Sequence, residues 1–144
     1  MKRPVLALLL AGFTALGAPA QAQEPRDEPR EIVRRIAWRY THGQPPDPAR
    51  LPLVDRLLAA LARADIDGDV VMRNPANRME QAETGWSQRI DHQRARVLLR
   101  FREKGAPGEV EFLFDRASGP WLITEIRNRD GRSLRKLLQI PTLP

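Results

Sequence analysis

The sequence predicts an α+β domain in which two N-terminal helices pack on a curved antiparallel sheet of three to four strands, followed by a short C-terminal helix. Two observations indicate this fold. Residues 29–64 carry apolar side chains at helical spacing, whereas apolar and polar side chains alternate through most of residues 84–127, as in strands with one buried face. Helical segments followed by a run of strands are the order typical of an α+β fold.

The first 22 residues have the composition of a cleavable export signal. Lys2 and Arg3 precede an apolar run at residues 5–16, and the Ala-Gln-Ala sequence at 20–22 fits the small-x-small cleavage pattern. The apolar run is shorter than the roughly 20 residues that span a bilayer, so no stable membrane insertion is expected. We therefore expect a periplasmic or secreted protein. Because the chain has no cysteine, it has no disulfide and no cysteine for a lipid anchor.

The remaining chain is expected to form one domain. Residues 23–28 are polar and include a proline, which predicts a flexible lead-in, and residues 29–140 suit a single domain with one core. The chain is basic, with 24 Lys and Arg against 18 Asp and Glu. The acidic residues are interleaved with the basic ones, so the clustered basic face of a nucleic-acid-binding protein is not expected.

The first predicted helix covers residues 29–42 and ends at Gly43, a residue suited to the left-handed cap. Its apolar face is formed by Ile32, Val33, Ile36, Ala37 and Tyr40. Trp38 lies away from this face among arginines, a composition favoured at protein contacts, and the alternative is that a loop covers it. A second helix is predicted at about 52–64, and the short loop before it predicts an antiparallel pair.

Residues 65–83 have the weakest pattern. The alternating carboxylates of residues 65–69 resemble the start of a calcium loop, but Val70 and Ala76 occupy the places of the required glycine and glutamate. A polar turn is therefore expected. Residues 70–81 have weak periodicity, and we expect a connection that wraps the sheet edge as a short strand, short helix or loop.

Three later segments alternate clearly, and the first begins at Thr84. In it, Trp86, Gln88 and Ile90 are predicted to face the core. Segments 95–101 and 110–114 form a hairpin, and a two-residue type II′ turn with glycine first predicts that residues whose numbers sum to 211 face each other. Core residues then pair with core residues and arginines with acids, so no anion site is expected on the arginine row.

The last strand is predicted at residues 121–127. Trp121 is expected opposite Phe114, with a bulge near Thr124, and Ser133 is a plausible N-cap of a short helix. On the charged face of the sheet, three leucines are expected side by side and are candidates for the centre of a protein contact: Leu98, Leu113 and Leu122. The alternatives are an incidental patch or one covered by the C-terminal tail.

The segment 119–126 (Gly-Pro-Trp-Leu-Ile-Thr-Glu-Ile), followed by 130–138 (Asp-Gly-Arg-Ser-Leu-Arg-Lys-Leu-Leu), resembles the end of small exported bacterial proteins of the nuclear transport factor 2-like superfamily. Here Pro120 is inserted before the tryptophan. The resemblance implies a cone with a pocket between the helices and the sheet, and often a dimer through the outer face of the sheet. The residues expected to line that pocket are Tyr40, Trp86, Gln88, Phe112 and Trp121.

The superfamily contains enzymes, binding modules and scaffolds, so the fold leaves the function open. Gln88 and Tyr40, the polar residues expected inside, are poor general bases near neutral pH. No catalytic residue, metal site or cofactor is therefore expected. We expect a non-catalytic binding module that contacts a second copy, an unidentified periplasmic protein or a small apolar ligand in the cone. The alternatives are an isomerase- or dehydratase-type enzyme and an inhibitor- or immunity-like protein that uses an exposed Trp38.

Overall fold

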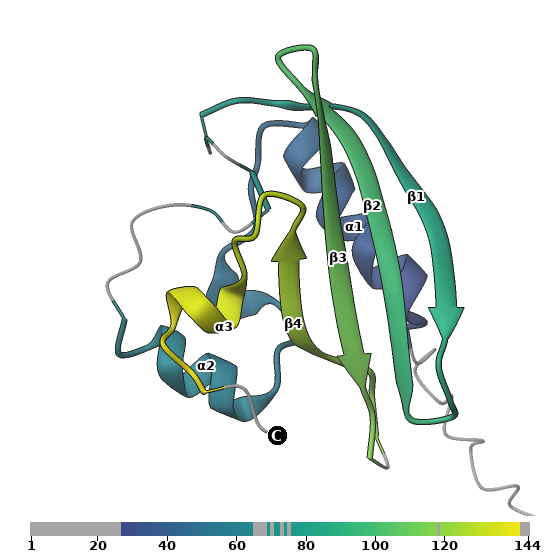
Figure 1. Ribbon diagram of the computed structural model, residues 1–144, viewed down its shortest axis with the longest axis vertical. Coiled ribbons are helices and arrows are strands. Elements are labelled where there is room, and N and C mark those ends of the chain that lie inside the picture. Colours follow the sequence, from purple (N-terminus) through teal and green to yellow (C-terminus); the bar gives the residue numbers. More distant parts are fainter. Residues whose placement is uncertain are drawn as a thin grey trace, which may run out of the picture.

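The computed structural model confirms the α+β fold and describes residues 27–64, 69, 71–72, 74, 76–117 and 119–141. Its elements are α1 (Pro29–Thr41), the 3-10 turn η1 (Pro48–Arg50), α2 (Asp55–Leu61), β1 (Met79–Arg89), β2 (Arg94–Glu103), β3 (Ala106–Asp115), β4 (Leu122–Asn128) and α3 (Leu134–Leu137). The four strands form one antiparallel sheet in the order of the chain, as Figure 1 shows.

Some expectations fall outside these described residues. The export signal at 1–22, residues 23–26 of the lead-in and residues 65–68 of the polar turn are among them. Among the helices that the structure describes, none is long and apolar enough to cross a bilayer.

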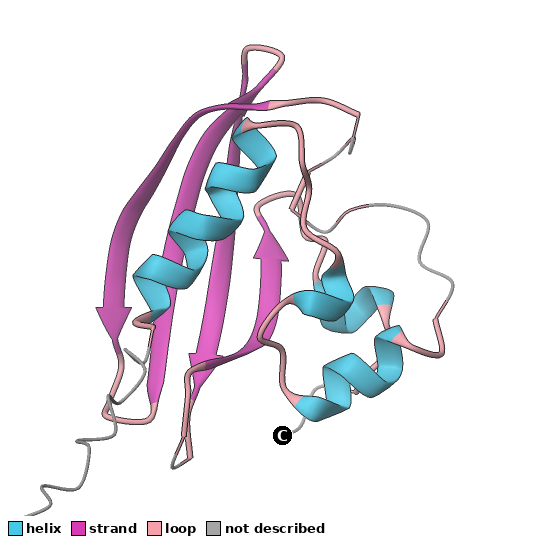
Figure 2. Cartoon of the chain, turned by 180° about the vertical axis from the view of Figure 1, so that it is seen from behind, coloured by secondary structure: helices cyan, strands magenta, loops and turns pink. Residues whose placement is uncertain are grey.

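Helix α1 begins at Pro29, and its predicted apolar face is buried. This helix crosses the inner face of the sheet over β1 and β2 (Figure 2). The buried side chains of α1 include all five predicted residues: Ile32, Val33, Ile36, Ala37 and Tyr40. Burying one aliphatic side chain of this size stabilises a fold by roughly 1.5–3 kcal/mol, so this face holds α1 on the sheet.

Helix α2 is shorter than predicted and does not pair with α1. The chain before it is held extended by β4, because the Ile123 N–H donates to the Pro52 carbonyl (2.6 Å) and the Val54 N–H to the Ile123 carbonyl (3.1 Å). The helix therefore begins only at Asp55. It lies beside α3, beyond β4 (Figure 1), so the expected antiparallel helix pair is wrong.

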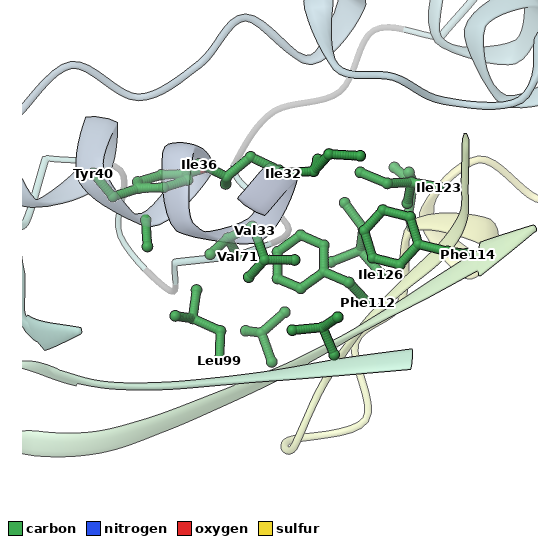
Figure 3. Packing of buried hydrophobic residues seen from close by; sticks show 14 of the residues in the cluster. Ile32, Val33, Ile36, Tyr40, Val71, Leu99, Phe112, Phe114, Ile123 and Ile126 are labelled. Atoms are coloured by element: carbon green, nitrogen blue, oxygen red, sulfur yellow. The ribbon is translucent and has the colours of Figure 1, made fainter. Parts of the chain in front are cut away.

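Side chains fill the space between α1 and the sheet. Figure 3 shows Val33 and Ile36 of α1 close to Leu99 and Phe112 of the strands. Val33, Leu99 and Phe112 have no exposed surface, and Trp121 is 2% exposed. Phe112 and Trp121 are thus part of the continuous core.

The β2–β3 hairpin has a different turn and register from those predicted. Lys104 and Gly105 both have positive φ (49° and 78°), as a type I′ turn requires, so the turn lies one residue earlier than expected. Paired residue numbers now sum to 209, and Val97 pairs with Phe112. A shift of two residues keeps every side chain on its predicted face. It also places Phe101 opposite Gly108, where the missing side chain leaves room for the ring.

Several side chains of β1 face the opposite side of the sheet from the one that the sequence predicts. The strand begins at Met79, earlier than the alternation indicates, and its register shifts twice, between Glu80 and Glu83 and between Thr84 and Ser87. After the second shift, Ser87 pairs with Val97 on the core face and Gln88 pairs with Arg96 on the outer face. β1 is an edge strand of the sheet, where fewer contacts enforce the alternation.

The β3–β4 pair contains the predicted bulge. Leu113 pairs with Glu125 and Phe114 with Ile123, so Thr124 is the extra residue. The expected pairing of Trp121 with Phe114 is wrong by two residues. After β4, the Ser133 hydroxyl accepts the Lys136 N–H (3.3 Å), which confirms Ser133 as the N-cap of α3.

Candidate functional site

The structure does not bring the five predicted pocket residues together. Tyr40, Phe112 and Trp121 are buried in the core. Trp86 and Gln88 lie on the opposite face of the sheet, where Gln88 accepts two hydrogen bonds from the Arg96 guanidinium (2.9 and 2.6 Å). The inner face therefore contains a packed core at the place where the resemblance implies a pocket.

Tyr40 is fixed in the interior as a hydrogen-bond donor. Its hydroxyl donates to Asp69 Oδ2 (2.5 Å), while Asp69 Oδ1 accepts the N–H groups of Val71 (2.7 Å) and Met72 (3.2 Å). Burial, with the nearby Asp69 carboxylate, raises the pKa of Tyr40 well above its ordinary value. This hydroxyl therefore keeps its proton near neutral pH and holds the Asp69 carboxylate beside α1.

Two guanidinium groups lie close to the indole ring of Trp121, and the sequence did not indicate either contact. Arg116 lies 4.4 Å and Arg89 5.5 Å from the centroid of its indole, both within cation–π range. Arg89 also forms an ion pair with Glu28 (2.8 Å), ahead of α1. These contacts close the core at the end where β1 finishes and β4 begins.

The outer face of the sheet, hereafter the outer sheet face, carries charges of one sign on each of β1, β2 and β3. Charge alternates across these three strands, since β1 is acidic, β2 basic and β3 acidic, while β4 has Arg127 and the buried Glu125 on this side. The residues are Glu80 and Glu83 on β1; Arg94, Arg96, Arg100 and Arg102 on β2; Glu109, Glu111 and Asp115 on β3; and Arg127 on β4. The acidic β1 row went unnoticed in the sequence because weak periodicity hid this half of the strand.

Ion pairs connect neighbouring rows. Arg100 Nε lies 3.2 Å from Glu109 Oε2, and Arg96 Nη1 lies 3.6 Å from Glu111 Oε1. These side chains are partly exposed, so each pair contributes only about 0.2–1 kcal/mol to folding. The acids balance the arginine row as the sequence predicts, although the partners follow the corrected register.

Apolar groups lie at the centre of this charged surface. The two-residue shift in each hairpin places Leu98, Leu113 and Leu122 on a diagonal rather than side by side. Leu98 is buried and the other two are half-buried. Trp86 is 42% exposed, with the Arg96 guanidinium carbon 4.6 Å from its ring centroid.

A shallow hollow lies beside this apolar centre. It has a volume of about 360 Å³, and its lining includes Trp86, Leu98, Arg100, Glu111 and Arg127. An aromatic ring and a leucine are thus surrounded by charges of both signs. Such a composition, with an apolar centre and a charged rim, is typical of protein contact surfaces.

Trp38 forms a second exposed aromatic surface, on the side of α1 away from the sheet. It is 56% exposed and stacks on His42, with ring centroids 4.1 Å apart. His42 Nδ1 also lies 2.7 Å from the Trp38 carbonyl oxygen, which fixes the imidazole at the end of the helix. The indole of Trp38 and the imidazole of His42 therefore form a stacked pair of rings on the surface of α1.

The described part of the chain contains no group of three or more His, Asp or Glu side chains placed to hold a metal ion. Comparison with known proteins finds no match to a family model, a curated protein or a solved structure.

Proposed function

We propose that this protein is an exported, non-catalytic binding module of the nuclear transport factor 2-like type that acts through a protein contact on the outer sheet face. The observation that carries the proposal is the alternation of charge across β1, β2 and β3 around an apolar centre. Because each charged row has a row of opposite sign beside it, this surface is complementary to a copy of itself. We therefore propose a second copy as the partner.

The charge pattern selects one arrangement of the two copies. Homodimers use a two-fold axis, and two stacked sheets lie about 10 Å apart. With the axis parallel to the strands and between β2 and β3, the basic β2 row faces the acidic β3 row of the other copy. Arg127, the outer arginine of β4, then faces the part of β1 around Trp86 in the other copy, with Glu83 further along that strand. With the axis across the strands, arginines would face arginines, which costs free energy.

The dimensions of the face set the expected strength. The two central strands have 10 residues each. At about 3.4 Å per residue and about 4.8 Å between strands, the four strands cover roughly 650 Å² before side-chain relief is counted. Stable interfaces bury about 800 Å² per partner, so this face is at the lower end of that range. We expect a reversible dimer that is sensitive to salt.

Two features support a protein contact over chemistry or ligand binding in the interior. Core side chains occupy the space between α1 and the sheet, so a small apolar ligand would have to displace them. The isomerase- or dehydratase-type alternative needs a proton-transfer group inside, and Tyr40 is held there with its pKa raised.

Sedimentation equilibrium over a range of concentrations tests the proposed dimer. Leu113→Asp places a carboxylate at the half-buried centre of the face and should abolish the dimer. Leu137→Asp is the matched control, because Leu137 is 42% exposed on α3 and lies near Ala60 and Arg63, outside the lining of the outer-face hollow. A wild-type protein that stays monomeric at every concentration, or equal dimerisation of both variants, would refute the proposal.

The exposed Trp38 favours a second candidate, an inhibitor- or immunity-like protein whose contact surface is α1. Affinity purification from periplasmic extract with the wild type and Trp38→Ala as baits, followed by mass spectrometry, tests it. A partner retained by the wild type and by Leu113→Asp but lost with Trp38→Ala would support this candidate. Equal recovery with all three baits would contradict it.

A further inference from the structure

We propose that a pocket beside α3, hereafter the α3 pocket, binds a small oxyanion of the phosphate type. The pocket has a volume of about 340 Å³. Four cationic side chains line it, from Arg127, Arg132, Arg135 and Lys136, together with the carboxylate of Glu125, and Arg132 is also paired with the neighbouring Asp130. It is distinct from the arginine row of β2, whose charges the acids of β1 and β3 balance.

The fold brings these cations together through one tight turn. Arg127, at the end of β4, forms an antiparallel bridge with Ser133, and the Asn128 N–H donates to the Arg132 carbonyl (2.8 Å). Gly131 turns the chain at a φ of 89°, which favours glycine. As a result, Arg127 and Arg132 approach the pocket from opposite arms of the turn, and α3 supplies the other two cations.

Two guanidinium nitrogens of residues that line this pocket are buried and have no acceptor. Arg132 Nη2 and Arg135 Nε are both inaccessible to solvent, and neither has a hydrogen-bond partner in the described part of the chain. A buried N–H without an acceptor costs about 1–3 kcal/mol. Because neither nitrogen has solvent-accessible surface, a ligand oxygen reaches it only after the guanidinium group turns toward the pocket, and the new hydrogen bond then removes that cost.

Both guanidinium groups are already held in place by their other nitrogens. Arg132 Nε donates to the Asp130 carboxylate (3.1 Å), and Arg135 Nη2 donates to the Pro141 carbonyl (2.8 Å). Little side-chain entropy remains to be lost on binding, which favours affinity. Arginine donors also match the geometry of phosphate oxygens.

Glu125 gives the pocket a basis for selectivity. It is 6% exposed, and its Oε1 accepts the N–H groups of Ile126 (3.0 Å) and Arg135 (3.1 Å). Together with Ser133 it caps α3, so a ligand would be held by side chains and not by the helix end. A carboxylate repels a bare anion but can accept a hydrogen bond from a P–OH group. Phosphate keeps a proton near neutral pH, whereas sulfate has none, so phosphate should bind more tightly.

Isothermal titration calorimetry at constant ionic strength tests the site with inorganic phosphate and with sulfate. Phosphate should bind saturably and sulfate more weakly. Arg127→Gln should weaken phosphate binding about tenfold, the loss of one charge-assisted contact. Arg129→Gln removes the same charge two residues away, outside the pocket lining, and should change nothing. Arg127 is exposed, so its replacement should not unfold the protein.

Glu125→Gln keeps the capping oxygen and removes the charge, so it should reduce the preference for phosphate over sulfate. Further titrations with glycerol phosphate and with phosphatidylcholine vesicles containing phosphatidic acid distinguish a free ion from a lipid monoester. Binding of any of these three phosphates that is weakened by Arg127→Gln but not by Arg129→Gln supports the site. Absence of saturable binding of all three, or equal weakening by both variants, would overturn it.

Discussion

The guanidinium group of Arg96 lies over the indole ring of Trp86, 4.6 Å from its centroid, on the outer sheet face. This contact depends on the β1 register shift between Thr84 and Ser87, which places Gln88 beside Arg96. Trp86, expected in the core from the sequence, is thereby partly exposed under a cation. The contact creates the aromatic part of the surface that we propose as the dimer interface.

The Arg96–Trp86 contact should appear as a coupling free energy between the two residues. A double-mutant cycle with Arg96→Met and Trp86→Leu should give about 0.5–1 kcal/mol, the usual magnitude of a partly exposed cation–π pair. Urea unfolding followed by circular dichroism measures it at a protein concentration low enough to exclude a dimer. Additive effects of the two substitutions would show that the contact contributes nothing.

Gly108→Ala should destabilise the β2–β3 hairpin. A Cβ at this position would lie 2.4 Å from Phe101 Cε2, so the ring must move. Overpacking of this kind costs about 1–3 kcal/mol. Gly119→Ala is the matched control, because nothing lies within 4 Å of its Cβ position. Urea titration measures the free energy of unfolding of both variants. Equal stability of the two would contradict the register that places Phe101 opposite Gly108.

Tyr40 should resist ionisation as long as the protein is folded. It is the only tyrosine in the sequence, so the ultraviolet absorbance of tyrosinate reports on it alone. Burial raises its pKa, and the Asp69 carboxylate raises it further. The unfolded chain has a tyrosine pKa near 10, so this group's contribution to stability is complete below that pH and is lost as pH rises above it. A reversible titration near pH 10 without unfolding would show that the hydroxyl is accessible.

The pKa of Asp91 should lie below that of an ordinary aspartate, which is about 3.9 in model peptides. Its pKa is lowered first by the backbone N–H of Gln93 and then by the Arg94 side chain, which form the β1–β2 turn. Stability from this carboxylate is present above pH 4 and is lost as pH falls through the lowered pKa. The Arg94→Gln substitution should raise the pKa of Asp91 only partly, since the hydrogen bond from the Gln93 N–H remains, and NMR titration of the variant measures this pKa. A pKa that returns fully to its ordinary value would assign the whole effect to Arg94.

The sequence predicted the class of fold because periodicity decides which face of an element is buried, and that signal was strong in α1, β2 and β3. Periodicity did not predict the register of the hairpins, since a two-residue shift leaves every side chain on its face and changes only its cross-strand partner. Gly108 was the overlooked signal, because a glycine inside a strand often marks a close approach by a neighbouring side chain.

The candidate surfaces were predictable only in part. Leu98, Leu113 and Leu122 were placed on the correct face but in the wrong arrangement, because their positions depend on two hairpin registers. Trp86 was assigned to the wrong face because a bulge in an edge strand leaves little trace in the sequence pattern. The α3 pocket was not predicted, since it depends on a turn that brings together arginines five residues apart.

The most direct test of the proposed dimer uses two charge reversals that are complementary only between copies. Arg100→Glu and Glu109→Arg each place like charges beside each other, both within the chain and across the proposed two-fold axis. In a mixture of the two variants the repulsion within each chain remains, but every contact between unlike chains pairs opposite charges.

Sedimentation velocity on each variant and on their equimolar mixture measures the outcome. We predict that the wild type dimerises, that each variant alone is monomeric, and that the mixture recovers the dimer. A mixture that stays monomeric while the wild type dimerises would contradict the proposed pairing of β2 with β3 across the interface. A wild type that never dimerises would contradict the proposal that the outer sheet face binds a second copy.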